Sequence, residues 1–220
     1  MQASNDLLQF IIAGLTTGAI YALIALGFSV VHNAMGIVNF VQVDFVSLGG
    51  MLMFSALLTL GLPMMPGVLL AVAGVAVVAM LVERFGLRPS RSHNELVLIF
   101  LTIGLSIILR GAMKMIWGTN RMALPPLSGE EPISLFGATI LPQAVWILLL
   151  TVVAISLLHW FFHHTPLGLA MRAVASNPTA AAVVGIRGGR IRLTSYGIAG
   201  ALGGLAGVLV TPITTLSYDV

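Results

Sequence analysis

The chain contains no cysteine, so it has no disulfide framework and no thiolate metal site, and its redox compartment cannot be read. Charged residues are also scarce: they make up 8% of the 220 residues, against about a quarter in a typical soluble domain. Hydrophobic residues make up 58%, and the mean hydropathy is +1.06. So few charges could not cover a water-exposed surface, and the composition therefore indicates an integral membrane protein.

Lysine is almost absent: it occurs once among ten basic residues, as Lys114. An ATP-binding loop of the Walker type ends in Gly-Lys-Ser or Gly-Lys-Thr. Lys114 lies between Met113 and Met115, so the chain has no such loop, and any ATP-driven work would have to come from another subunit. The net charge of +3 is too small to suggest a nucleic-acid partner.

Candidate catalytic groups are few. His159, His163 and His164 lie close together, and the first two share a helical face. A metal site needs a further ligand of defined geometry, and no acidic residue is near. No spacing indicates a nucleophile with its base, or paired acids. We predict no catalytic residue, metal or cofactor, and keep a histidine-dependent membrane enzyme as the weakest hypothesis.

Long apolar runs are what the chain has in quantity. Each run is near the about 20 residues that cross the hydrocarbon core of a bilayer. The leader, residues 1–6, has no Lys or Arg, so we read the first run as a permanent helix and not a secretory signal. The sequence predicts an all-α polytopic bundle, one transmembrane domain over residues 1–220. The predicted spans are 7–31, 40–60, 66–82, 96–117, 140–162 and 193–210.

The basic residues predict an orientation. Seven arginines lie in two loops on the same side of a six-span model, and three basic residues lie on the other side. The positive-inside rule makes the first side cytoplasmic and the N-terminus external. The seven are Arg84, Arg88, Arg91, Arg172, Arg187, Arg190 and Arg192; the three are Arg110, Lys114 and Arg121. Arg110 and Lys114, four residues apart, either snorkel to the outer interface or line an aqueous vestibule.

The loop 163–192 is the longest polar interval before the last span. Thr165 before Pro166 and Asn177 before Pro178 are both a capping residue followed by proline at the first helical position. Gly185 can end a helix in a left-handed turn. We predict two short helices, 166–175 and 178–184, joined at 176–177. An arginine-edged helix pair suits a docking surface for a cytoplasmic partner, and an ordinary structured loop is the alternative.

Polar residues cluster where the first span gives way to the second. Asp44 is the only acid well inside a predicted span, near its cytoplasmic end. An ionisable group inside a span is costly, so Asp44 is a candidate functional residue. Alternatively, Asp44 lies at the membrane interface or caps the start of a broken helix, and both interpretations stay open. Gly36, Gly49 and Gly50 suggest irregular backbone, which a membrane tolerates only inside protein or along a cavity. The neighbouring polar residues are Asn33, Asn39, Gln42 and Ser47.

Small residues spaced four apart predict close helix packing. The first span carries Gly14 and Gly18, and the last span carries the two overlapping pairs Gly200 with Gly204 and Gly203 with Gly207. This spacing is common in membrane helices, so it indicates packing and carries no function by itself.

Four motifs in order resemble the permeases of branched-chain amino-acid ABC transporters, the LivH type. Gly36-Ile-Val-Asn39-Phe40, with Asp44 and Gly49, is similar to the family pattern G-x-x-N-F-A-H-G-E. Glu83-Arg84 and Arg88-Pro89 resemble its E-R-x-x-x-R-P signature. The resemblance runs from about residue 7 to 212 and includes the Gly/Ala-rich helix 200–207. The loop matches are Leu167-Gly168, Arg172-Ala173, Asn177, Ala181 and Gly185-Ile186.

The resemblance implies a permease subunit of a bacterial inner-membrane ABC importer. Its partners would be two ATP-binding subunits inside, a second permease (related or a second copy) and a solute-binding protein outside. It implies that 178–184 is the coupling helix, and that Asn39, Gln42, Asp44 and Ser47 lie by the translocation path. The implied coupling residues are Gly168, Arg172, Asn177, Pro178, Ala181 and Gly185.

The chain departs from the family pattern in two ways. Val41-Gln42-Val43-Asp44 stands where the family has A-H-G-E, which leaves open whether the solute is a branched-chain amino acid or a related small polar solute such as an amide or urea. Family members also run on for two more helices, so we expect a truncated chain. The competing hypothesis is a self-sufficient secondary transporter or channel, with Asp44 as its ion or proton site.

Overall fold

The computed structural model describes residues 2–90, 94–119, 124–129, 131, 133–135 and 138–214. Arg91 and Arg121, which the orientation argument used, lie outside these ranges. The helices are α1 Gln2–Met35, α2 Gln42–Phe54, α3 Met64–Leu81, α4 Glu95–Trp117, α5 Pro142–His164, α6 Pro166–Ser176, α7 Pro178–Val183 and α8 Gly188–Val210. The π-helical turns η1 Ser55–Thr59 and η2 Val82–Leu87 extend α2 and α3.

Six helices of the described residues are long and apolar enough to cross a membrane: α1, α2 with η1, α3 with η2, α4, α5 and α8. The prediction of a six-span α-helical bundle is confirmed. The helices differ from the apolar runs at their ends; α8, for example, starts at Gly188 and not at Leu193. Polar residues can continue a helix through the headgroup region. Hydropathy alone therefore places the predicted helix ends too deep in the membrane.

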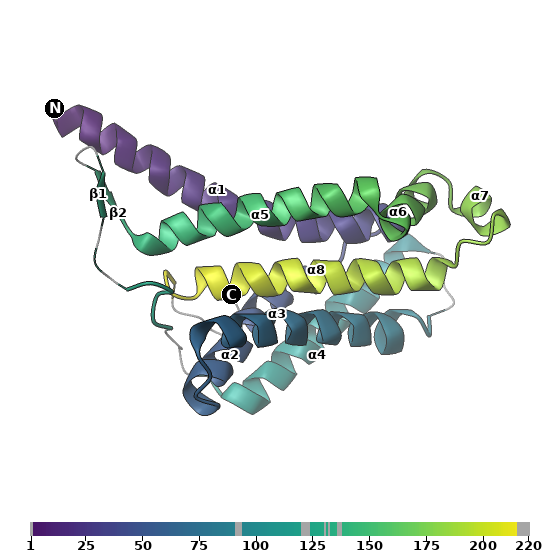
Figure 1. Ribbon diagram of the computed structural model, residues 1–220. Coiled ribbons are helices and arrows are strands. Elements are labelled where there is room, and N and C mark those ends of the chain that lie inside the picture. The colour runs from purple at the N-terminus through teal and green to yellow at the C-terminus, as the bar shows by residue number, and fades with distance from the viewer. Residues whose placement is uncertain are drawn as a thin grey trace.

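The segment between α4 and α5 contains a small β-hairpin. Strands β1 Ile133–Leu135 and β2 Ala138–Ile140 pair antiparallel. The hairpin and the N-terminus lie at one end of the bundle, and α6 and α7 lie at the other (Figure 1). We call these the hairpin end and the α7 end.

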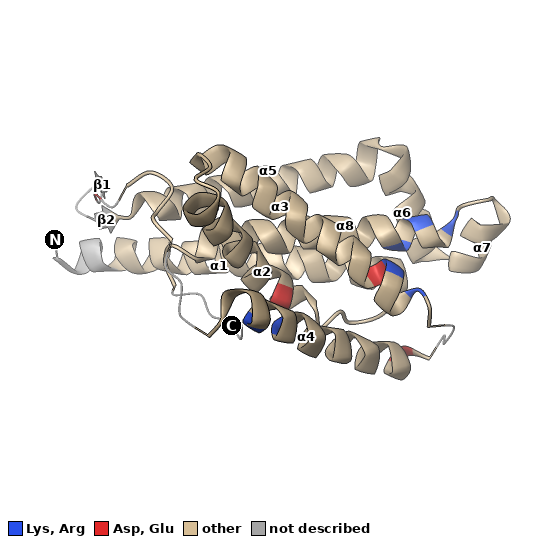
Figure 2. Cartoon of the chain, turned by 90° about the horizontal axis from the view of Figure 1, so that it is seen from below, with Lys and Arg blue, Asp and Glu red and all other residues tan. Residues whose placement is uncertain are grey.

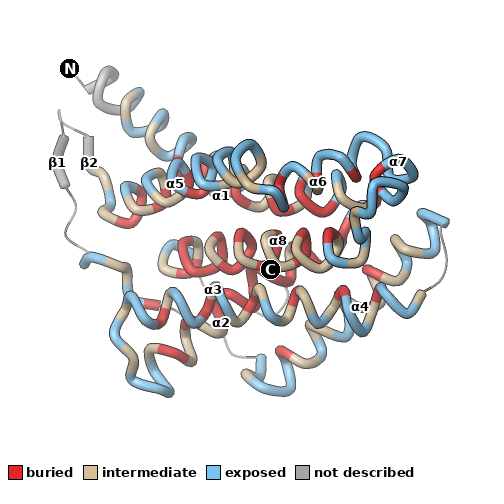
Figure 3. Tube along the Cα trace, turned by 45° about the vertical axis from the view of Figure 1, so that its right-hand side comes forward, coloured by how far each residue is buried: buried red, intermediate tan, exposed pale blue. Residues whose placement is uncertain are grey.

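Helix α8 forms the centre of the bundle. It runs between α1 and α5 on one side and α2 and α3 on the other (Figure 1). In α8, 61% of the residues of the spanning window are buried, as in α2, whereas in α5 only 11% are (Figure 3). Exposed α5 residues are large and apolar, such as Val152 and Leu157. Helix α5 therefore presents a lipid-facing surface, and α2 and α8 form the interior.

Glycines let α8 approach its neighbours closely. A Cβ on Gly207 would overlap the carbonyl oxygen of Val46 in α2, and one on Gly200 would lie 2.5 Å from the Cβ of Ala79 in α3. A Cβ on Gly204 would lie 3.0 Å from the Cβ of Val75 in α3. Larger residues at Gly200 and Gly207 would push the helices apart.

Gly14 and Gly18 in α1 behave differently. A Cβ at either position meets nothing within 4 Å among the described residues, so α1 packs closely against none of them there. The close packing expected at these two glycines stays a prediction.

Candidate functional site

Helix α2 begins inside the bundle and not at its surface. The amide nitrogen of the Gln42 side chain donates to the carbonyl oxygen of Ala199 over 3.1 Å. Ala199 is the twelfth of the 23 residues of α8, so this contact lies about halfway along that helix. The segment 36–41 therefore enters the bundle as irregular backbone, starting at Gly36 with a φ of 71°. The sequence suggested irregular backbone at Gly36, Gly49 and Gly50, but not its depth. The prediction is wrong for Gly49 and Gly50, which lie within the regular helix α2.

Backbone groups of the irregular segment find partners both within the segment and on α4. The side-chain oxygen of Asn39 accepts from the backbone N–H of Val41 over 3.3 Å, and its carbonyl accepts from the N–H of Gln42 over 3.2 Å. The N–H of Phe40 donates to the hydroxyl of Thr102 in α4 over 3.5 Å. Such pairing is what allows non-helical backbone at membrane depth.

Asp44 and Arg110 form an ion pair between α2 and α4. The Nε of Arg110 donates to a carboxylate oxygen of Asp44 over 2.6 Å. The side chain of Asp44 is 1% exposed, and that of Arg110 is 41% exposed. The carboxylate is thus enclosed and paired, while part of the guanidinium remains at the surface of this chain.

The depth of this pair follows from a second contact between the same helices. Trp117 donates its indole N–H to the hydroxyl of Ser55 over 2.7 Å, near the hairpin end. Asp44 precedes Ser55 by eleven residues, or about 16 Å along a helix. Arg110 precedes Trp117 by only seven residues, or about 10 Å, so it starts nearer the hairpin end than Asp44 does. Its side chain therefore points from there back into the bundle, and the interpretation that it snorkels to the outer interface is wrong. Asp44 lies in the first turn of α2, and because that helix starts inside the bundle, Asp44 is buried there and not at the membrane interface.

Helix α4 contributes two further polar residues that the sequence reasoning did not identify. Thr102 and Ser106 precede Arg110 at intervals of four, so the three lie on one helical face. Thr102 is fully buried and Ser106 is 6% exposed. Their spacing of four residues in the sequence could have indicated this polar helical face. We call Asn39, Gln42, Asp44, Ser47, Thr102, Ser106 and Arg110 the polar seam.

The four residues predicted to lie by the path are all enclosed: none of Asn39, Gln42, Asp44 and Ser47 is more than 1% exposed. One polar atom of each has no hydrogen-bond partner among the described residues. Buried polar groups are normally paired, so four such atoms in one short segment call for an explanation. Exposure to a solute or to water in another state of the protein would provide one.

The two short helices predicted in the loop 163–192 are present as α6 and α7. The side chain of Thr165 accepts from the N–H of Gly168 over 3.0 Å, and that of Asn177 accepts from the N–H of Ala180 over 2.9 Å. Both are the expected N-caps. A Cβ on Gly168 would overlap the carbonyl oxygen of Phe161, so the tight turn from α5 into α6 requires glycine.

Helix α7 ends as predicted at Gly185, with a φ of 87°. The N–H of Gly185 donates to the carbonyl of Ala182, and that of Ile186 to the carbonyl of Ala181, both over 3.0 Å. This pair of bonds is the Schellman motif. Val183 and Val184 are 83% and 76% exposed. The helix that extends farthest from the bundle (Figure 1) thus carries an uncovered apolar tip.

A second buried acid lies near the α7 end. The side chain of Glu83, in η2, is fully buried, and its carboxylate lies 3.7 Å from the Nε of Arg192 in α8. Tyr196, one turn further along α8, is also fully buried. Glu83 begins the E-R-x-x-x-R-P signature, so this signature links η2 to the first turns of α8.

Comparison with known proteins identifies the family. The family model described as "Branched-chain amino acid transport system / permease component" matches residues 10–218. The chain belongs to this family of permeases. The high-affinity branched-chain amino acid transport system permease protein LivH of Escherichia coli K12 is 30% identical over 92% of this chain and 70% of its own length. BraD of Pseudomonas aeruginosa, a permease protein described in the same words, gives the same figures.

A more distant member of the permease family comes from an archaeon. The probable branched-chain amino acid transport permease protein LivH of Methanocaldococcus jannaschii is 28% identical over 86% of this chain and 61% of its own length. No solved structure matches the chain. Family membership therefore rests on sequence. The structure shows where the family motifs lie, in the polar seam and in the pair of helices α6 and α7.

Proposed function

We propose that this permease is a membrane subunit of an ATP-driven importer, and that α7 docks on the ATP-binding subunit. The observation that carries the proposal is the apolar tip Val183–Val184, which projects beyond the spans on a helix capped at both ends. An exposed apolar tip on a rigid helix suits burial in a partner's groove. Family membership supplies the kind of partner.

The α7 end would then face the cytoplasm. Basic residues gather at this end, on α6, η2 and the start of α8 (Figure 2). The positive-inside rule favours the cytoplasm for such an end, which places the N-terminus and the β-hairpin outside. The proposed location is the bacterial inner membrane, with two ATP-binding subunits at the α7 end and a solute-binding protein at the hairpin end.

Movement of α7 would pass into the membrane through α8. Only residues 184–187 separate the two helices, and α8 forms the centre of the bundle. The ion pair of Arg192 with Glu83 ties the same end of α8 to η2. A shift of the ATP-binding subunits would therefore move α8 and its neighbours as a rigid group.

The translocation path would run along the α2–α4 side. The side chain of Arg110 is 41% exposed although it reaches into the bundle to Asp44, and lipid does not solvate a charged side chain cheaply. This side must therefore face water or protein, which fits a path shared with a second permease, related or identical. Asp44 is bonded to Arg110, and Asn39, Gln42 and Ser47 are buried in the same stretch of chain; these four residues would come to line the path as the helices move.

The solute would be a branched-chain amino acid or a related small polar solute such as an amide or urea. The named relatives are branched-chain amino acid permeases. The change of the family's A-H-G-E to Val41-Gln42-Val43-Asp44 is the reason to keep the wider class of solutes.

A pull-down tests the docking role of α7. The tagged chain is expressed with its neighbouring genes, solubilised in detergent and compared with a variant in which residues 178–183 are replaced by a Gly/Ser linker. We expect an ATP-binding subunit to co-purify with the wild type and to be lost with the variant. The double variant Val183→Ser, Val184→Ser should weaken this association as well.

The matched control removes two exposed apolar side chains at the hairpin end. Leu58 and Leu60 are 60% and 61% exposed, and the double variant Leu58→Ser, Leu60→Ser should keep the ATP-binding subunit. Recovery of that subunit with the linker variant would refute docking through α7. Its absence from the wild-type preparation would refute the importer assignment.

A further inference from the structure

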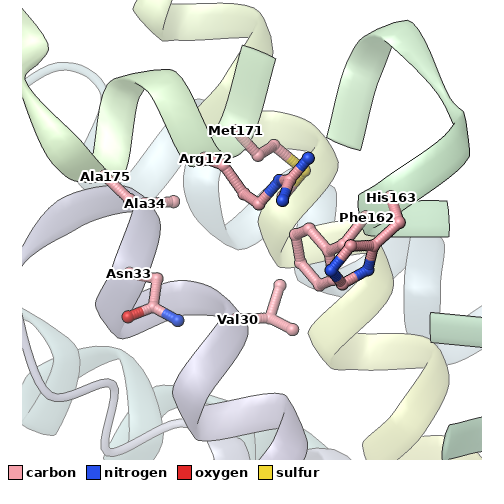
Figure 4. A pocket seen from close by; sticks show the side chains of 8 residues that line it. All are labelled: Val30, Asn33, Ala34, Phe162, His163, Met171, Arg172 and Ala175. Carbon is pink, nitrogen blue, oxygen red and sulfur yellow. The ribbon is translucent and has the colours of Figure 1, made fainter. Parts of the chain in front are cut away.

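A small cavity lies between α1, α5 and α6, on the opposite side of the bundle from the polar seam. Its volume is about 230 Å³. Figure 4 shows its lining: Val30, Asn33, Ala34, Phe162, His163, Met171, Arg172 and Ala175. Val30 and Met171 are each 3% exposed and form an apolar floor. Asn33, His163 and Arg172 are exposed and form a polar rim with one residue from each helix.

The rim favours an anionic ligand. Arg172 is a permanent cation, and no acidic side chain is among the described residues that line the cavity. The Nδ1 of His163 donates to the carbonyl oxygen of His159 over 2.8 Å, so this N–H is engaged within α5 and is not available to a ligand. Asn33 adds amide N–H donors. A guanidinium with nearby N–H donors matches the oxygens of a phosphate group.

The depth of the cavity favours a lipid as the source of that phosphate. Trp160 is 56% exposed and precedes His163 by three residues, or about 4.5 Å along α5. Exposed tryptophans of membrane helices mark the headgroup level. Below Trp160, α5 exposes Val152, Leu157 and other large apolar side chains along which acyl chains would lie. Helix α7, the proposed docking helix, projects beyond this level (Figure 1).

We propose that this cavity binds the phosphate of an anionic phospholipid, with Arg172 as its principal ligand and Asn33 as a further donor. Basic pockets between transmembrane helices bind anionic headgroups in this way. The bound headgroup would bridge α6 to the end of α1. It would thus hold α6, and through it α7, in place.

The test is native mass spectrometry of the full chain, purified in detergent with any associated subunits and titrated with phosphatidylglycerol. The wild type should bind phosphatidylglycerol at least about fivefold more tightly than phosphatidylcholine, the effect of roughly one arginine at an anionic surface. Arg172→Gln should abolish this preference. Ala175→Leu, which narrows the cavity without changing charge, should weaken phosphatidylglycerol binding too.

The matched control is Arg190→Gln, which removes the same charge from an exposed arginine of α8 that does not line the cavity. It should leave the preference intact. Equal losses in the two arginine variants, or equal binding of the two lipids, would overturn the proposal. Competition by inorganic phosphate as potent as the lipid would overturn the lipid as the source. If Arg172→Gln binds lipid as the wild type does but loses an ATP-binding subunit, the proposal is overturned, and the cavity would be a contact site for that subunit.

Discussion

At the scale of single residues, the pair of Asp44 and Arg110 is the most informative feature of this permease. A charge at membrane depth is costly by itself, and each of these charges offsets the other. Because the carboxylate is enclosed and bonded to Arg110 over 2.6 Å, Asp44 is poorly placed to bind a free ion. The geometry therefore disfavours a self-sufficient transporter that uses Asp44 as its ion site.

A double-mutant cycle tests this pair. Asp44→Leu alone leaves the Arg110 guanidinium without its partner and should destabilise the protein by about 1–3 kcal/mol, below the range for fully buried pairs because Arg110 is partly exposed. The double variant Asp44→Leu, Arg110→Leu removes both charges and should be more stable than Asp44→Leu. Thermal unfolding in detergent measures both, with Asp44→Asn as the isosteric control. Additive losses in the double variant would show that the two residues do not interact.

The sequence identified one member of this pair but not the other. Asp44 is conspicuous because it is the only acid well inside an apolar run. Arg110 lies 66 residues further along the chain, and its partner depends on how α2 and α4 are aligned in space. Periodicity within one helix contains no information about that alignment, so the sequence left Arg110 either at the outer interface or in an aqueous vestibule.

At the scale of helices, the glycines of α8 set the packing of the bundle. The close contact of Gly207 with the backbone of α2 leaves no room for a side chain, whereas Gly14 in α1 has open space around it. The same residue type with the same four-residue spacing thus has different surroundings in the two helices. The spacing predicts where helices can approach, but only the fold shows where they do.

Substitution by alanine separates the two cases. Gly207→Ala should destabilise the protein by about 1–3 kcal/mol, because the added methyl overlaps the Val46 carbonyl and forces α8 away from α2. Gly14→Ala should leave stability unchanged or raise it by up to about 1 kcal/mol, through helix propensity. Melting temperatures in the same detergent provide the measurement. A Gly207→Ala protein as stable as Gly14→Ala would contradict the close packing of α8 on α2.

The sequence predicted α6 and α7 well and the start of α2 poorly, for a physical reason. Caps such as Thr165 and Asn177, and the turn at Gly185, act within four residues, so short-range pattern is sufficient. The apolar run 40–60 continues across the true start of α2 at Gln42, because Phe40 and Val41, which precede the helix, are apolar as well. Hydropathy does not distinguish an apolar loop from an apolar helix.

At the scale of the whole molecule, we propose a subunit that works with others. The described residues form six helices that could cross a membrane and a further helix that projects from one end (Figure 1), and the printed sequence contains no Walker-type loop. Composition was sufficient to predict the class and the number of spans. The arrangement around α8 could not be predicted, because it depends on contacts between residues far apart in the chain.

Solute uptake into vesicles tests the central claim most directly. The chain is reconstituted with the products of its neighbouring genes, with the solute-binding protein and labelled leucine outside and ATP with Mg²⁺ inside. We predict uptake that requires enclosed ATP and is lost when residues 178–183 are replaced by a Gly/Ser linker. Uptake that proceeds without ATP, driven by an ion gradient and unaffected by the linker, would contradict the importer account.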